Sequence, residues 1–277
     1  MDETKRGIVV GYDGSPDADV ALKWAAAAAA LEDLPVLAVM VDQVDASPWG
    51  GLLWEPDEDL VPRVERILED SGVRGSVERL PGVIVPALLE AAGDASLLVV
   101  GSQGHGRGGE VLIGSVSQHL ARQAHCPVVV VREPAQRSAT RIVVGIDGSG
   151  DSAAALEFAC RRAELTGEDV VAVHGWKTGT LLVGRDGQLP HDIGRKIEEK
   201  EHLLAESVAG ARADHPDVTL IQEAIPLRPV QVLVDASASA SLVVTGSRGR
   251  GAFAGMLLGS VSHEVIHRAR CPVAVVR

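Results

Sequence analysis

The chain contains 277 residues, of which 46% are hydrophobic but only 3% aromatic, and 38 acidic against 26 basic side chains give a net charge of −12. This length accommodates one large domain or two ordinary ones, and a core of Val, Ala, Leu and Ile suits buried parallel strands covered by helices. The acidic balance argues against a nucleic-acid partner, no apolar run is long enough to span a membrane, and the polar start MDETKRG does not resemble a signal peptide.

Strands and helices are predicted to alternate along the first half of the chain. Apolar runs predict strands at residues 8–13, 36–42, 73–80, 96–101 and 127–132. Helical patterns between them predict helices at residues 17–31, 57–71, 84–93 and 114–124. Alternation of this kind implies right-handed β-α-β crossovers, so the expected fold class is α/β, a small doubly wound domain with a five-stranded parallel sheet flanked by helices.

The second half of the chain repeats this order. Strands are predicted at residues 142–147, 170–176, 218–225, 241–246 and 272–277, and residues 195–213 form a charged amphipathic helical pattern. Three blocks recur in the same sequence: GIVVGYDGS returns as RIVVGIDGS, a glycine-rich stretch returns, and HCPVVVVR returns as RCPVAVVR. The chain is therefore predicted to hold two copies of one domain, residues 1–132 and 141–277, joined by a linker at residues 133–140.

The cysteine content points to a reducing environment. Cys126, Cys160 and Cys271 give an odd count without a C-x-x-C pair, which disfavours a disulfide framework or a zinc site. Two of them precede Pro-Val at the start of an apolar strand, as small buried hydrophobic residues would. The cytoplasm is the expected location.

The glycine-rich stretch has the same spacing, G-x2-G-x9-G-S, in both copies. It reads Gly101, Gly104, Gly114 and Ser115 in the first copy, and Gly246, Gly249, Gly259 and Ser260 in the second. In a doubly wound sheet, ligands bind beyond the carboxyl ends of the strands where the winding direction reverses. If the first strand of each copy is central, its acidic end and this loop meet at one crevice.

Phosphate is the anion best matched to such a crevice. Glycines permit φ > 0 and let backbone N–H groups approach a ligand, and successive N–H groups form an anion-binding concavity. The helix that begins at the Gly-Ser pair adds uncompensated N–H donors, and Ser115, Ser117, Ser260 and Ser262 add hydroxyl groups. A plain turn remains the alternative for each glycine pair, and helix N-capping is the alternative for Ser115 and Ser260.

These motifs resemble the universal stress protein family, in its tandem, ATP-binding form. That family's signature is G-x2-G-x9-G-(S/T) after a first strand that ends in aspartate, and both halves of the chain match it. The resemblance implies an ATP-binding protein that regulates a stress response, with one ATP at the switch point of each domain and little or no hydrolysis. It also implies pairing of the last strands of the domains into a pseudo-dimer, further homodimerisation and an unidentified protein partner.

The resemblance also implies which residues line each site. Asp13 and Asp147 would contact the ribose or a magnesium ion bound to the phosphates, and Val41 and Gly175 would offer backbone groups to adenine. The first site would comprise Gly11, Asp13, Val41, Gly101, Ser102, Gln103, Gly104, His105, Gly106, Arg107, Gly114, Ser115, Val116 and Ser117. The second would comprise Gly145, Asp147, Gly175, Gly246, Ser247, Arg248, Gly249, Arg250, Gly251, Ala252, Gly259, Ser260, Val261 and Ser262.

The two loops differ in charge. The first has Gln103 and His105 where the second has Arg248 and Arg250, and it carries a glutamate at position 110. Fewer positive groups and one added negative group weaken polyphosphate binding. We therefore predict that the second site binds ATP more tightly than the first.

Catalysis is the weaker expectation. No G-x-x-x-x-G-K-[ST] motif occurs and no lysine lies in either glycine loop, so the positive group that a P-loop enzyme uses is missing. Slow ATPase, phosphotransferase or adenylate-forming activity is one alternative, and an interaction protein with vestigial sites is another. His263 and His267 match H-E-x-x-H, but the first copy lacks the pattern and no third ligand is evident, so two surface histidines are the preferred interpretation.

Overall fold

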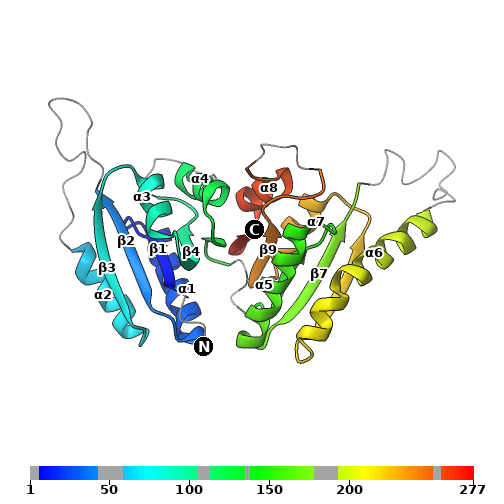
Figure 1. Cartoon of the computed structure of the whole chain (residues 1–277), viewed down its shortest axis with the longest axis horizontal. Helices are drawn as coiled ribbons and strands as arrows, with labels where there is room; N and C mark the ends of the chain where they lie inside the picture. Colours follow the sequence, from blue (N-terminus) through cyan, green and yellow to red (C-terminus); the bar gives the residue numbers. More distant parts are fainter. Residues whose placement is uncertain are drawn as a thin grey trace. The chain divides into compact units, whose positions relative to one another are not determined.

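The structure is a computed structural model that describes residues 6–42, 59–104, 113–134, 136, 138–177, 193–251 and 257–277. The chain divides into two compact units, the first ending at Glu133 and the second beginning at Pro134. In each unit, helices cover both faces of a sheet (Figure 1). The described helices include none that is long and apolar enough to cross a membrane.

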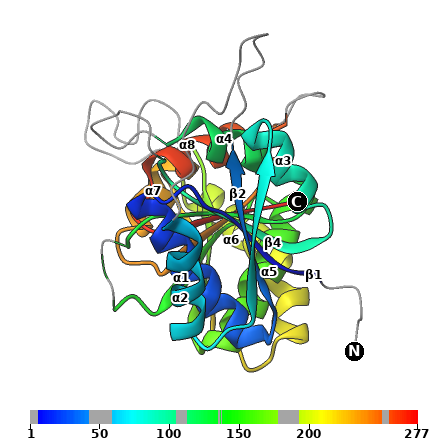
Figure 2. The ribbon, with the colours of Figure 1, turned by 90° about the vertical axis from the view of Figure 1, so that its left-hand side faces the viewer.

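The first unit contains a five-stranded parallel sheet in the order β3-β2-β1-β4-β5. Helices α1 and α2 lie on one side of the strands and α3 on the other (Figure 2). The first strand is central, which meets the condition on which the predicted crevice depends. The elements are β1 (Arg6–Gly11), α1 (Pro16–Glu32), β2 (Val36–Asp42), α2 (Leu60–Asp70), β3 (Gly75–Pro81), α3 (Ile84–Ala91), β4 (Ala95–Gly101), α4 (Ser115–Gln123) and β5 (Val128–Val131).

The second unit repeats the same topology in the order β10-β9-β6-β7-β8, again with parallel pairs. The fold class predicted from the sequence is confirmed, and the ends of the predicted elements move by only a few residues. The elements are β6 (Arg141–Gly145), α5 (Gly150–Thr166), β7 (Asp169–Gly175), α6 (Ile193–Asp214), β8 (Leu220–Ile225), α7 (Pro229–Ala236), β9 (Leu242–Gly246), α8 (Ser260–Arg268) and β10 (Val273–Val276).

The core consists of branched aliphatic side chains. All four residues of β5 and of β10 are buried, and so are the four central residues of β4, Leu97–Val100. Strands covered by helices on both faces are uniformly apolar, which explains why these runs show little alternation. The three cysteines are also buried, in agreement with their expected role as small hydrophobic residues.

Helices α1 and α5 begin directly after the central strand of each sheet. Ser15 caps α1, because its Oγ accepts a hydrogen bond from the Ala18 N–H at 3.2 Å. Ser149 caps α5 in the same way through the Ser152 N–H, also at 3.2 Å. A serine N-cap stabilises a helix by about 1 kcal/mol. The caps fix where each helix starts, immediately beside the predicted ligand crevice.

A buried histidine fastens α6 to α5 in the second unit. His215, which is 7% exposed and follows α6, has Nδ1 2.7 Å from Glu164 Oε1 and Nε2 3.0 Å from Glu157 Oε2. Hydrogen bonds to Glu157 and then Glu164 raise the pKa of His215, so these contacts favour the protonated ring. Cys160 lies on the same helix, and burial, aided by the charges of these glutamates, raises the pKa of its thiol to about 11.

Candidate functional site

The central strand and its neighbour end side by side in each sheet. In the second unit β6 lies between β7 and β9, with Ile142 opposite Val170 on one side and Leu242 on the other. Asp147 follows the end of β6, and the glycine loop follows the end of β9. The winding direction reverses between these two strands, so the crevice predicted from the sequence lies at the switch point.

Asp147 joins the turn after β6 to the glycine loop. Its Oδ1 accepts hydrogen bonds from the Ser149 N–H at 3.0 Å and the Ser149 hydroxyl at 2.6 Å. Its Oδ2 accepts a hydrogen bond from the Arg250 N–H at 2.9 Å. Burial by itself raises the pKa of Asp147, but the hydrogen bonds from Ser149 and Arg250 outweigh it and the pKa is lowered. The carboxylate is therefore ionised at neutral pH and holds the loop in place.

A second carboxylate, which the sequence analysis did not single out, holds the start of the same loop. Asp151 Oδ2 accepts hydrogen bonds from the Ser247 hydroxyl at 2.8 Å and the Arg248 N–H at 2.9 Å. Asp17 does the same in the first unit, for the Ser102 hydroxyl at 2.6 Å and the Gln103 N–H at 2.9 Å. The available signal was the recurrence of D-G-S-x-D, as DGSPD and DGSGD, in which the second aspartate is also repeated.

Close packing explains the first two glycines of each motif. A Cβ at Gly249 would collide with Asp147 Oδ2, and one at Gly246 would lie 2.7 Å from the carbonyl carbon of Asp151. In the first unit, a Cβ at Gly104 would lie 2.5 Å from Asp13 Oδ2. Of the two roles considered for the motif glycines, close approach is therefore found, and positive φ is not found at those that the structure describes.

Positive φ occurs instead in the turn after the central strand. Gly14 has φ +82° and Gly148 has φ +78°. Each of these glycines lies between the aspartate and the N-cap serine, where the chain must turn sharply from strand to helix. Glycine is thus required for a positive φ on the aspartate side of the crevice. On the loop side it is required because the backbone packs closely against the aspartate.

The far end of the loop is tied back to its beginning. The Gly259 N–H donates to the Ser247 carbonyl oxygen at 2.7 Å, and the Ser262 hydroxyl donates to the Gly246 carbonyl oxygen at 2.6 Å. Ser117 makes the matching hydrogen bond to Gly101 at 2.7 Å in the first unit. The hydroxyl protons of both serines are therefore used within the loop, although Ser262 still lines the crevice.

The helix after the loop begins without a side-chain cap. Gly259 occupies the N-cap position of α8, and no side chain caps it; Gly114 has the same place before α4. The alternative that Ser115 and Ser260 act as N-caps is therefore wrong, because each is the first residue of its helix. Ser260 is exposed, so its hydroxyl and the first N–H groups of α8 face the crevice as uncompensated donors.

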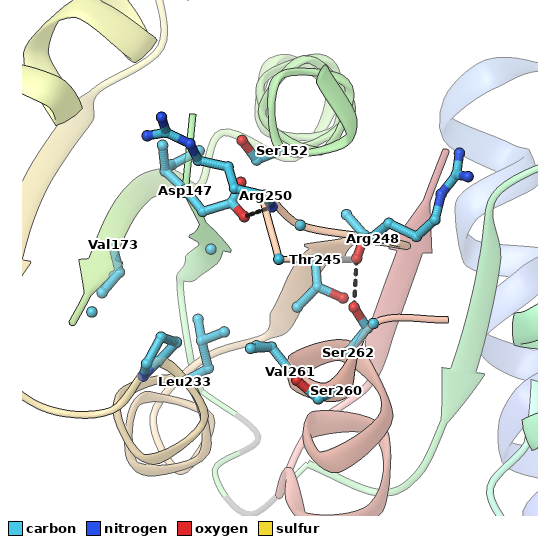
Figure 3. A pocket seen from close by; sticks show the side chains of 18 residues that line it. Asp147, Ser152, Val173, Leu233, Thr245, Arg248, Arg250, Ser260, Val261 and Ser262 are labelled. Carbon is cyan, nitrogen blue, oxygen red and sulfur yellow. Dashed lines mark hydrogen bonds between the residues drawn. The ribbon is translucent and has the colours of Figure 1, made fainter. Parts of the chain in front are cut away.

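A cavity of about 320 Å³ opens at this point of the second unit (Figure 3). It has apolar walls near α7 and a polar side formed by the glycine loop and the start of α8. Twelve predicted residues line it: Gly145, Asp147, Gly175, Gly246, Arg248, Gly249, Arg250, Gly251, Gly259, Ser260, Val261 and Ser262. Six further residues that the sequence analysis missed complete the lining: Ile146, Ser152, Val173, Pro229, Leu233 and Thr245.

The remaining predicted residues fall into three groups: Ser247 beneath the loop of the second unit, residues of the first unit, and residues that the structure does not describe. Ser247 is fully buried beneath the loop, where it bonds Asp151. Val41 occupies the position in β2 that Gly175 occupies in β7. Gly11, Asp13, Gly101, Ser102, Gln103, Gly104, Gly114, Ser115, Val116 and Ser117 occupy matching places in the first unit. His105, Gly106, Arg107 and Ala252 lie outside the described residues.

Two other sequence features can be placed. The side chain of Arg248 is 53% exposed and lies 3.5 Å from Asp151 Oδ2. The rings of His263 and His267 on α8 meet edge to face, with centroids 4.7 Å apart. Within the described ranges, no group of three His, Cys, Asp or Glu side chains is arranged to hold a metal ion.

The fold and the crevice define a class of protein: a tandem pair of doubly wound α/β domains, each with a glycine loop at the switch point. The family model for the universal stress protein family matches residues 5–132 and again residues 139–277. The chain belongs to the universal stress protein family.

Relatives of the same length carry this family name. The chain is 36% identical over 293 residues to universal stress protein Rv2005c of Mycobacterium tuberculosis, covering 99% of this chain and 97% of the relative. It is 36% identical over 292 residues to universal stress protein Rv2623 of the same species, covering 98% and 96%. A crystal structure of a universal stress protein from Archaeoglobus fulgidus has a TM-score of 0.69 at 21% identity, covers 98% of both chains and shares the fold.

Proposed function

We propose that the chain binds ATP at the switch point of each of its two domains and acts as a nucleotide-dependent regulatory protein of the stress response. The observation that carries this proposal is the glycine loop of the second unit. Asp147 and Asp151 anchor it through the backbone N–H groups of Arg250 and Arg248. The described first part of the loop, residues 246–251, is thus held by these hydrogen bonds and, with the uncapped start of α8, lines a cavity of about 320 Å³.

The chemistry of the lining fits a nucleotide. Free N–H groups at the start of α8 and the Ser260 hydroxyl suit the phosphates, since a helix N-terminus favours anions. Val173 and Leu233 supply an apolar wall suited to a base. A magnesium ion would be held chiefly by the phosphates, with Asp147 as the nearest carboxylate of the lining, because a hard cation prefers oxygen ligands. Such an ion would neutralise phosphate charge.

The proposal is one of binding with little or no hydrolysis. The described lining offers the arginines Arg248 and Arg250 but no lysine, and the only carboxylate in it, Asp147, already accepts three hydrogen bonds. A carboxylate with a lowered pKa is a weak base for activating water. Regulation would then follow from nucleotide occupancy, in the cytoplasm, through a homodimer or a pseudo-dimer of domains 1–132 and 141–277 and a protein partner.

The test is to purify the full chain under native conditions, denature it, and quantify the released nucleotide by chromatography. Apo protein is then titrated with ATP and magnesium by calorimetry. About two ATP per chain supports both sites, and about one supports the predicted asymmetry. Recovery of ADP or AMP together with turnover above background would replace the binding proposal with an enzymatic one. No nucleotide recovered and none bound on titration would overturn the proposal.

A further inference from the structure

A buried hydroxyl in the wall of the second site has no hydrogen-bond partner in the part of the chain that the structure describes. Thr245, the residue before the first motif glycine of that copy, is 3% exposed, and its Oγ1 is shielded from solvent without a hydrogen bond. Buried polar groups are nearly always paired, because an unpaired one loses its hydration without compensation. A methyl group in the same place would carry no such cost. The hydroxyl therefore destabilises the ligand-free fold, and its presence calls for a reason other than stability.

The position of Thr245 points to the ligand. It lines the cavity, and Figure 3 shows it above Ser262 and Val261, with Asp147 and Leu233 further to the left. The phosphate-binding donors lie further along the chain, in the loop after Gly246 and at the start of α8. Thr245 thus lies where the apolar wall meets the polar loop.

The first unit provides a comparison within the same chain. Val100 occupies the equivalent position before Gly101 and is also 3% exposed. Valine and threonine have the same shape and differ only in one methyl against one hydroxyl. The fold therefore accommodates either valine or threonine at this position, and packing alone does not require the hydroxyl of Thr245.

We propose that Thr245 is a specificity-determining residue of the second site, whose hydroxyl hydrogen-bonds the nucleoside part of the bound nucleotide. The inference rests on the proposed function. Rotation about the Cα–Cβ bond by one rotamer step moves Oγ1 to the place now held by the methyl group or by the β-hydrogen, which lets it turn toward the cavity when a ligand supplies a partner. The hydroxyl then forms a hydrogen bond only in the bound state. It therefore contributes to ligand affinity while lowering the stability of the ligand-free protein. The first site, with Val100, lacks this contact.

The surroundings of the Thr245 hydroxyl favour the nucleoside over the phosphates as its hydrogen-bond partner. Phosphates are bound by charged or multiple backbone donors, which the loop and helix start already supply. A single neutral hydroxyl in a cavity whose lining also includes the apolar Val173 and Leu233 is suited to one hydroxyl or ring nitrogen of a nucleoside. Such a site discriminates strongly, since a ligand lacking the matching group leaves the hydroxyl unpaired.

The experiment compares Thr245→Val with Thr245→Ser in the full chain, using ATP, AMP and tripolyphosphate as titrants in calorimetry. Thr245→Val is expected to weaken ATP and AMP at one site by about tenfold, equal to 1.4 kcal/mol, while raising the melting temperature of the empty protein by about 2–4 °C. Tripolyphosphate affinity is expected to stay unchanged. Thr245→Ser keeps the hydroxyl and is expected to keep ATP affinity within about twofold.

Val100→Thr is the matched control. It is expected to lower the melting temperature, because it buries a new hydroxyl, and to leave the second site unaffected. If wild-type protein binds ATP and Thr245→Val binds it equally well, the inference fails and the proposed function stands. If Thr245→Val weakens tripolyphosphate as much as ATP, the assignment to the nucleoside is wrong. If wild-type protein binds no nucleotide, the proposed function fails and the inference fails with it.

Discussion

Replacing Gly249 by alanine tests whether the loop must approach the aspartate as closely as the structure indicates. The added Cβ would overlap Asp147 Oδ2, the oxygen that accepts the Arg250 N–H at 2.9 Å. Relief of that overlap requires the carboxylate and the loop to separate, which breaks this hydrogen bond. The side chain of Asp147 also receives two hydrogen bonds from Ser149 and is not free to move away on its own.

The size of the effect follows from the bond that is lost. A hydrogen bond to a charged group contributes about 1.5–3 kcal/mol, and about 1.4 kcal/mol corresponds to a tenfold change in affinity. Because the bond orders the loop that lines the cavity, Gly249→Ala is expected to weaken ATP binding at the second site by about 10- to 100-fold. The fold itself is expected to survive, since the loop lies outside the hydrophobic core.

Gly150→Ala is the matched control. Gly150 does not line the cavity, a Cβ there has no described atom within 4 Å, and both substitutions restrict the unfolded chain equally. Two-site calorimetric titration of the full chain with ATP and magnesium distinguishes the variants, and circular dichroism checks their folding. Affinity within twofold of wild type in Gly249→Ala would refute the reasoning. So would an equal loss in Gly150→Ala, because it would show that losing a glycine near the site, and not this contact, governs binding.

Three further predictions concern charged groups. Asp147→Asn is expected to cost more ATP affinity than Asp13→Asn, since the second loop alone carries two arginines where the first has Gln and His; a larger loss for Asp13→Asn in calorimetry would contradict this. Asp151→Asn is expected to weaken ATP binding about three- to tenfold, through loosening of the loop start, and wild-type affinity would contradict it. His215→Gln is expected to destabilise the fold by about 1–2 kcal/mol at pH 6 in urea unfolding, and by less at pH 9. Because its glutamate partners raise the pKa of His215, this stabilisation is complete below the ordinary value near 6.5 and is lost as pH rises through the raised folded value; an effect independent of pH would contradict it.

The sequence by itself determined the fold class and indicated the crevice at the switch point. Apolar runs that alternate with helical patterns encode β-α-β units locally, and their recurrence requires two copies. The motif glycines and the aspartate after the first strand marked the crevice, because parallel strands of a doubly wound sheet end at one edge. Twelve of the residues that the family resemblance implied line the cavity of the second unit.

Only the tertiary structure decided what those residues do for one another. Arg250 and Asp147 are 103 positions apart in the chain, and Arg248 and Asp151 are 97 apart, so no local pattern indicates that they are hydrogen-bonded. The same holds for the unpaired hydroxyl of Thr245, which differs from an ordinary strand residue only through its surroundings. Sequence periodicity reflects which face of an element is buried. Which side chains meet across different elements depends on how the chain crosses from strand to strand. For this reason only the tertiary structure shows that Gly249 is required by its close approach to Asp147 and not by freedom of φ.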